Sequence, residues 1–135
     1  MSTNYTNAFI VASPDSEAAS GIVPGKPETI AGMQYALLHD RPYELTSDEL
    51  LFEVYCLRGG IPASERTKAR AQFFSQSHPC LRTSPLVKQY GWGIHHDATA
   101  KIALHGVGTA DYRRLSQSPD LTVVAGMRSK RAKTG

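Results

Sequence analysis

The chain has 135 residues, 41% of them apolar and 20% charged, and a formal net charge of +3. A chain of this length can bury a sizeable core without disulfides or metals, and it contains no apolar run close to the roughly 20 residues that span a bilayer. These values exclude transmembrane, collagen-like and mostly disordered proteins. Residues 1–7 contain no basic side chain and precede no long apolar stretch, so we expect no secretory signal and a cytoplasmic location. Cys56 and Cys80 are too few for a disulfide framework.

The first part of the chain predicts one strand, a loop and one helix. Residues 8–12 form a short apolar run, and the turn residues Ser13-Pro14-Asp15 close it, which is typical of a buried strand. Residues 16–27 show no periodicity and predict a loop. Apolar side chains then recur at helical spacing, which predicts a helix over residues 28–41.

Two further helices are predicted in the middle of the chain. Thr46 and Glu49 match the capping box, in which each side chain bonds a free backbone N–H of the other residue, so a helix is expected over residues 46–59. The apolar residues 50–57 would also suit a buried strand, which is the alternative interpretation. A proline at a first helical position and an outward row of basic side chains predict a third helix over residues 62–74.

The second half of the chain predicts a hairpin, a short helix and a last strand. After an irregular connector over residues 78–85, alternating segments at 90–97 and 101–107 predict a β-hairpin. A helix over residues 109–115 and a strand over residues 121–125 follow. The order β-α-α-α-β-β-α-β favours an α+β domain with a small, mainly antiparallel sheet and about four helices over a doubly wound fold.

The predicted hairpin has one apolar and one polar face. Pairing Ile94 with Ile102 and Trp92 with Leu104 places these four side chains together. Four polar side chains then share the other face: His95, Asp97, Lys101 and His105.

Two patterns resemble known sites but depart from them. The loop over residues 21–27 is one residue too short for a phosphate-binding loop, and Pro27 stands where that motif needs a hydroxyl. The run His95-His96-Asp97, with His105, would offer metal ligands. Adjacent strand residues point to opposite faces, however, and the expected register puts His105 roughly 13 Å along the strand from His95. We therefore predict no metal site, and the sequence indicates no cofactor.

Charge is distributed unevenly along the chain. Residues 1–65 carry three basic and nine acidic side chains, whereas residues 66–135 carry twelve basic and three acidic ones. We expect a globular domain over residues 1–127 and a basic tail over residues 128–135. Three tail cations are candidates for contact with nucleic acid or a protein partner: Arg128, Lys130 and Arg131. A solvated chain end is the alternative, and the sequence leaves open whether the acidic and basic halves pair within one chain or between two.

The connector and the polar hairpin face form the predicted binding site. A guanidinium fork and a hydroxyl suit carboxylate or phosphate oxygens, and a histidine changes charge near neutral pH. The sequence therefore predicts that a small anionic ligand or a protein partner binds five residues: Arg82, Ser84, Lys88, His95 and Asp97. The alternative is that Arg82 and Ser84 only hold the backbone of the connector.

Two other functions are weighed against ligand binding. The first is catalysis by Cys80, because Arg82 beside it would favour a reactive thiolate. His95 and Asp97 would then be the base and the orienting group. A lone cysteine, however, is more often buried and inert. The basic half could bind nucleic acid through phosphate contacts and base stacking. Candidate residues for this function are Arg66, Lys68, Arg70, the tail cations, Tyr90 and Trp92. No known nucleic-acid-binding motif is present, however, and Trp92 suits the core.

Six sequence blocks, spread over nearly the whole chain, are similar to a known family pattern. They begin at Asn4 (NYTNAFI, followed by SPD), Leu51 (LFEV), Cys80 (CLRTSPL), Tyr90 (YGWGIHHD), Asp111 (DYRRL) and Met127 (MRSKRA). The chain resembles an uncharacterised family of small single-domain proteins found mainly in bacteria and some fungi. The resemblance implies a stand-alone protein of unknown function, and it carries over no activity, cofactor or catalytic residue. Because the tail block is part of the pattern, residues 128–131 are expected to dock on the domain or to bind a partner.

Overall fold

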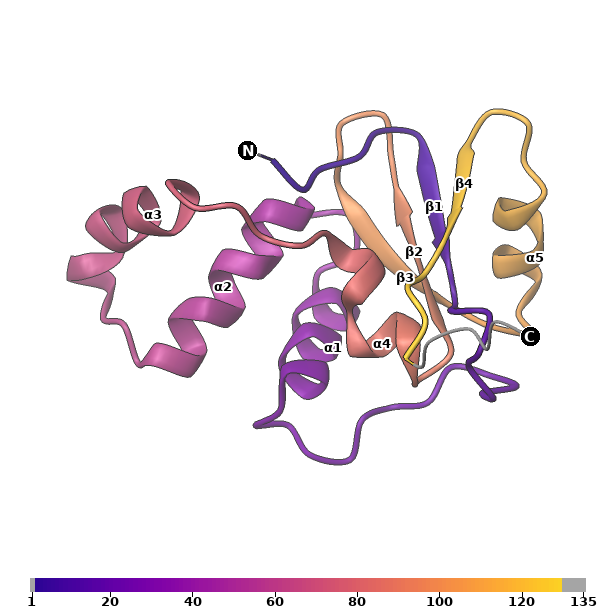
Figure 1. Cartoon of the computed structure of the whole chain (residues 1–135), viewed down its shortest axis with the longest axis horizontal. Helices are drawn as coiled ribbons and strands as arrows, with labels where there is room; N and C mark the ends of the chain where they lie inside the picture. The colour runs from indigo at the N-terminus through magenta and orange to yellow at the C-terminus, as the bar shows by residue number, and fades with distance from the viewer. Residues whose placement is uncertain (1, 130–135) are drawn as a thin grey trace, which may run out of the picture.

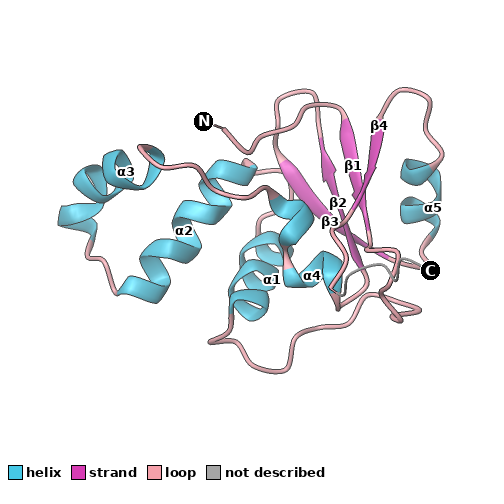
Figure 2. Cartoon of the chain, viewed as in Figure 1, coloured by secondary structure: helices cyan, strands magenta, loops and turns pink. Residues whose placement is uncertain are grey.

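The computed structural model describes residues 2–129, which form a four-stranded sheet with helices on both faces (Figures 1 and 2). The strands are β1 (Ala8–Val11), β2 (Trp92–His96), β3 (Ile102–Gly106) and β4 (Thr122–Ala125). Their order in the sheet is β3-β2-β1-β4; β2 runs antiparallel to both of its neighbours, whereas β4 runs parallel to β1. The sheet is therefore mixed but mostly antiparallel, and the predicted α+β fold is confirmed.

The helices of the described part of the chain are α1 (Ile30–Asp40), α2 (Ser47–Gly59), α3 (Arg66–Phe74), α4 (Pro85–Lys88) and α5 (Ala110–Ser116). In the sequence, α1 to α4 come between β1 and β2, and α5 comes between β3 and β4. In space, these helices lie on both sides of the sheet (Figure 2). Two short 3₁₀ turns precede α3 and α4: η1 (Ala63–Glu65) and η2 (Leu81–Thr83). The sequence predicted an irregular connector over residues 78–85, whereas the structure forms η2 and the start of α4 there. No helix among the described residues is long and apolar enough to cross a membrane.

The structure confirms the helix α2 and excludes a buried strand there. Thr46 Oγ1 accepts a hydrogen bond from Glu49 N at 3.2 Å, and Glu49 Oε1 accepts one from Thr46 N at 3.0 Å. This capping box satisfies N–H groups that the start of a helix otherwise leaves free. Gly60 adopts the left-handed conformation, with φ at 60°, that ends the helix.

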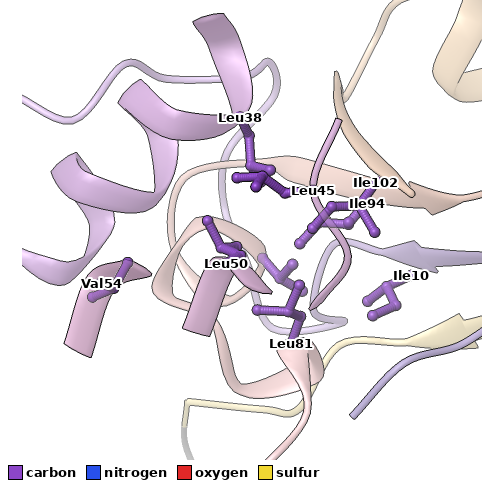
Figure 3. Packing of buried hydrophobic residues seen from close by; sticks show 9 residues of the cluster. Ile10, Leu38, Leu45, Leu50, Val54, Leu81, Ile94 and Ile102 are labelled. Carbon is purple, nitrogen blue, oxygen red and sulfur yellow. The ribbon is translucent and has the colours of Figure 1, made fainter. Parts of the chain in front are cut away.

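The main core lies between one face of the sheet and the helices α1, α2 and α4 (Figure 3). Ile10, Ile94 and Ile102 belong to three adjacent strands, and each is fully buried. Leu38 of α1 and Leu50 of α2 pack in the same cluster. The strands present apolar side chains to this face, as predicted, because successive residues of a strand point to opposite sides.

The register of the hairpin differs from the prediction by two residues. Ile94 pairs with Leu104 rather than with Ile102. The length of the turn explains this difference. Asp97 N donates to Lys101 O at 2.9 Å, so residues 98–100 form the turn that reverses the chain. The expected pairing would have left a single residue in the turn. A shift by two residues keeps every side chain on its predicted face, because the side-chain period of a strand is two.

The opposite face of the sheet carries α5 (Figure 1). Phe9 points to this side, and its ring packs edge-on against Tyr112 of α5 with centroids 5.1 Å apart. His95 is the partner of Phe9 in the pairing of β1 with β2, so it lies on the same face. The polar face of the hairpin and the main core are therefore on opposite sides of the sheet.

Helix α3 and the C-terminal half of α2 project away from the sheet and have a small core of their own (Figure 1). Phe52 and Cys56 of α2 pack there against Ala69 and Phe73 of α3. This projection leaves one side of α2 free to line a groove beside the connector.

Candidate functional site

The predicted ligand-binding residues lie on two sides of the sheet. Arg82 is in η2, Lys88 is in α4, and Ser84 is the N-cap of α4; both elements pack on the side of the main core (Figure 1). His95 lies on the α5 side, as the pairing with β1 requires, and Asp97 is in the turn that follows. The structure therefore does not bring the connector and the polar hairpin face together into one site.

Arg82 and Ser84 both hold the backbone of the connector. Arg82 Nε donates to Ala125 O at 2.6 Å, and Arg82 O accepts from Met127 N at 2.8 Å, which joins the connector to the end of β4. Ser84 Oγ accepts from Leu86 N at 3.2 Å and so caps α4. These contacts are the ones expected if the two side chains stabilise the local fold.

Lys88 lies beside a shallow hollow of about 620 Å³ that Asp15 and Ser129 also line. Ser129 N donates to Asp15 Oδ2 at 2.9 Å, so the first residues of the tail lie on the domain. Arg128 is exposed at this point. The other predicted tail contacts lie outside the described residues: Lys130 and Arg131.

Two of the cations considered for nucleic-acid binding make contacts within the protein. Arg66 donates to both carboxylate oxygens of Glu53, at 2.9 and 3.2 Å. The guanidinium of Arg70 lies 4.9 Å from the ring centroid of Phe74, which is a cation–π contact. Lys68 is exposed and has no partner among the described residues. Fewer cations are therefore free for phosphates than the sequence alone suggests.

The structure places Cys80 beside a tyrosine. Its sulfur lies 3.4 Å from Tyr5 Oη, and within the described part of the chain no histidine is hydrogen-bonded to it. His95, the base considered from the sequence, contacts Tyr43 on the other side of the sheet. A cysteine-dependent reaction would need another group to accept the thiol proton.

Asp97 organises the hairpin turn. Its Oδ1 atom accepts hydrogen bonds from Thr99 N, Thr99 Oγ1 and Lys101 N, each at 2.9 Å. Desolvation acts to raise the pKa of Asp97, but these hydrogen bonds outweigh it and hold the pKa below its ordinary value. Asp97 is therefore ionised at neutral pH and bonded to its own turn.

His95, Tyr43 and His105 form a hydrogen-bonded cluster on the α5 side of the sheet, which we call the His–Tyr–His cluster. Tyr43 Oη is 2.8 Å from His95 Nδ1 and 3.0 Å from His105 Nε2. The ring centroids of the two histidines are 6.2 Å apart. The predicted separation of roughly 13 Å along the strand was therefore wrong. The observed register places His105 opposite Gly93, which is diagonal to His95 on the same face.

Tyr43 reaches this cluster from the segment that follows α1. Its backbone N–H donates to Ile102 O at 2.8 Å, which fixes the segment beside β3. Its φ of 58° lies in the left-handed region, which residues other than glycine seldom adopt. The side chain remains 38% exposed, so the cluster is open to solvent.

The cluster is uncharged at neutral pH. Burial lowers the pKa of His95 and of His105 below the ordinary value for histidine. Burial also raises the pKa of Tyr43, so the phenol keeps its proton. This proton is donated to one imidazole, and the Tyr43 oxygen accepts a hydrogen bond from the other.

A second candidate site is a groove of about 280 Å³ between α1, α2 and the connector, which we call the connector groove. Its walls are mainly apolar and include Leu51 of α2 and Phe73 of α3. Three polar side chains that bear on ligand binding also line it: Gln34, Arg58 and Ser84.

Gln34 supplies hydrogen-bond donors to the connector groove. Ser84 Oγ donates to Gln34 Oε1 at 2.6 Å, which sets the orientation of the amide. The amide nitrogen of Gln34 has no hydrogen-bond partner among the described residues, although only 3% of the residue is exposed. Arg58, at the end of α2, is exposed and makes no ion pair with any residue that the structure describes. A mainly apolar groove is thus lined by an amide nitrogen and a guanidinium that have no partner within the described part of the chain.

A model of a family of unknown function, DUF6157, matches residues 1–132. The chain belongs to this family. No curated protein and no solved structure matches the chain. The resemblance that the six sequence blocks indicate is thus confirmed at the level of the family, and DUF6157 membership brings no known ligand or reaction with it.

The sequence did not single out three residues of these two sites in this DUF6157 protein: Gln34, Tyr43 and Arg58. Gln34 interrupts the apolar stripe of α1, which was a usable signal because a polar side chain at a buried position needs a partner. Tyr43 and Arg58 carried no comparable signal. His105 was placed on the polar hairpin face, but the predicted register separated it from His95.

Proposed function

We propose that this DUF6157 protein binds a small organic anion in the connector groove. The amide hydrogens of Gln34 and the guanidinium of Arg58 donate to carboxylate or phosphate oxygens, and the apolar walls hold the hydrocarbon part of the ligand. The amide nitrogen of Gln34 carries the proposal, because it has no acceptor within the described part of the protein although only 3% of the residue is exposed. Because Gln34 lines the groove, a ligand oxygen there can accept the hydrogen bond that this donor has free.

The lining of the groove supports a ligand of mixed character. Binding pockets for small molecules are mostly apolar and contain a few polar groups that orient the ligand. Leu51, Val54 and Leu81 supply the apolar surface, and His78 stacks on Phe73 with ring centroids 3.8 Å apart. The volume of about 280 Å³ suits a small acid.

The hollow beside Lys88 suits an anion less well. Asp15 and Glu17 share its lining, and their carboxylates repel negative charge. Of the five residues predicted from the sequence, only Ser84 lines the connector groove, where it orients Gln34.

Saturation-transfer NMR with matched acids and amides tests the proposal. Benzoate and hexanoate are expected to bind, whereas benzamide and hexanamide, which have nearly the same size and no charge, are expected to bind much more weakly. The Arg58→Ala variant should weaken benzoate binding about tenfold or more, because a hydrogen bond to a charged group contributes about 1.5–3 kcal/mol. Arg113→Ala is the matched control, since Arg113 is also exposed near a helix end and makes no ion pair with a described residue.

A second variant tests the amide itself. Gln34→Glu keeps an acceptor for Ser84 Oγ but replaces the amide donors with an oxygen, so benzoate binding should be lost while the circular dichroism spectrum is unchanged. The proposal would be overturned if the amides bound as well as the acids, or if Arg113→Ala weakened binding as much as Arg58→Ala. Absence of binding by all four compounds at millimolar concentration would also overturn it.

A further inference from the structure

The His–Tyr–His cluster brings three metal-ligating atoms together at the surface of the sheet. No three His, Cys, Asp or Glu side chains in the described part of the chain are placed to hold a metal ion, and in this cluster the third donor is a tyrosine oxygen. Imidazole nitrogens suit zinc, copper, nickel and iron, whereas calcium and magnesium favour sites made of oxygen ligands.

The spacing of the donor atoms matches one corner of a metal coordination shell. Ligand atoms that lie about 2.1 Å from a metal ion are about 3.0 Å apart at the right angles of a tetragonal copper site, and about 3.4 Å apart at the tetrahedral angle that zinc favours. The distances from Tyr43 Oη to His95 Nδ1 and to His105 Nε2 are 2.8 and 3.0 Å. The Tyr43 oxygen can therefore share one ion with each imidazole, once side-chain rotations turn both ring nitrogens toward the same point.

From this geometry we propose that the cluster binds a divalent zinc or copper ion through His95 Nδ1, His105 Nε2 and Tyr43 Oη. On binding, the Tyr43 hydroxyl releases its proton to solvent, and the imidazole that donates to Tyr43 carries its proton on its other ring nitrogen instead, which frees the ligating nitrogen. The phenolate oxygen then bonds the ion in place of its two hydrogen bonds to the imidazoles. Because 38% of Tyr43 is exposed, the remaining coordination positions of the ion face solvent and stay open to water or to a further ligand.

Two of the three side chains are on paired strands, and the third is in a turn that is hydrogen-bonded to β3. His95 and His105 are on adjacent strands whose pairing is continuous from Trp92 to His96. Tyr43 is tied to β3 by the hydrogen bond from its N–H to Ile102 O. Donors mounted on rigid elements lose little freedom when an ion binds, which favours affinity.

The charges around the cluster favour a cation. Asp97 lies near enough to act electrostatically on His95, and Asp111 acts in the same way on His105. Arg114 opposes them, but its guanidinium is paired with Asp111 at 3.3 Å. Two carboxylates and one paired guanidinium leave the surroundings net negative.

Metal titrations of tag-free, EDTA-treated protein test this inference. Isothermal titration with Zn²⁺ should show one ion per chain, and His95→Ala or His105→Ala should weaken binding by at least about tenfold. Titration with Cu²⁺ should produce a visible phenolate-to-copper absorption band that Tyr43→Phe abolishes. His95→Gln is included because it keeps a hydrogen-bonding partner for Tyr43 and removes only the imidazole, so its loss of Zn²⁺ affinity cannot come from a misfolded hairpin.

The matched control is His39→Ala. His39 is another exposed histidine next to a tyrosine, since Tyr35 Oη lies 3.4 Å from His39 Nδ1, but no second histidine contacts it among the residues that the structure describes. Its removal should leave Zn²⁺ binding unchanged. Equal weakening by His39→Ala and His95→Ala would overturn the proposal, as would unchanged binding in His105→Ala or the absence of any Zn²⁺ binding by the wild type.

This site is independent of the connector groove, which is on the other side of the sheet. Arg58→Ala should therefore leave Zn²⁺ affinity unchanged, and failure of either proposal leaves the other one standing.

Discussion

Lowering the pH from 7.5 to 4 is expected to destabilise this protein through His96. The imidazole of His96 is fully buried on the core side of β2, and neither ring nitrogen has a hydrogen-bond partner within the described part of the chain. Burial, reinforced by the neighbouring His95, lowers the pKa of His96 from 6.5 to about 4. Between pH 6.5 and pH 4, His96 is therefore protonated in the unfolded chain and neutral in the folded chain.

The size of this effect follows from the difference between the two pKa values. Each pKa unit corresponds to about 1.4 kcal/mol, so His96 should lower the free energy of unfolding by about 3 kcal/mol between pH 7.5 and pH 4. This stability is fully present well above pH 6.5, falls progressively as the pH drops below 6.5, and is lost once the pH has passed the folded-state pKa of about 4. A loss of this size is a large part of the stability of a small domain.

Urea unfolding of metal-free protein at a series of pH values measures this effect. The wild type is compared with His96→Leu, whose side chain cannot ionise. Acid also protonates Asp48 and Glu49, whose pKa values are lowered in the folded state, but these groups act in both proteins and cancel in the difference. Parallel stability curves for the two proteins, or an NMR titration giving His96 a pKa near 6.5, would refute the argument.

Two further substitutions test local features of the fold by urea unfolding. Thr46→Ala removes the hydroxyl of the capping box and should lower the free energy of unfolding by about 1 kcal/mol. The control Thr67→Ala, at an exposed position of α3, should change it by less than about 0.5 kcal/mol. Equal effects of the two substitutions would contradict the role of the cap. Gly32→Ala would place a methyl group against the backbone of Lys26 and should cost about 1–3 kcal/mol, whereas Gly25→Ala meets no atom within 4 Å. If Gly32→Ala had the same free energy of unfolding as the wild type, the close approach of α1 to the preceding loop would not be required for stability.

Local signals in the sequence predicted the secondary structure well. Thr46 and Glu49 identified the start of α2, and the structure forms both hydrogen bonds of the capping box. Thr109 was expected to begin α5, and its hydroxyl accepts from Tyr112 N at 3.1 Å. These signals succeed because the interacting groups are three residues apart, so few conformations satisfy them.

The candidate sites depend on contacts between distant residues. Ser84 meets Gln34 across 50 positions of the sequence, and Tyr43 meets His95 across 52. No local signal predicts such pairs. Arg82 illustrates the same limit. The sequence predicted that Arg82 binds a ligand, but in the structure its Nε atom donates to Ala125 O.

By itself, the sequence determined the four longer helices, the strands and the face on which each strand side chain lies, because capping and alternation act over a few neighbouring residues. It did not determine α4, which falls partly in the connector predicted as irregular. Only the tertiary structure decided that His95 and His105 meet at Tyr43, and that Gln34 lines a groove with Arg58. A shift of two residues in the hairpin leaves the pattern of faces unchanged but changes which side chains are neighbours. Those neighbours are set by the turn and by the packing of segments far apart in the chain.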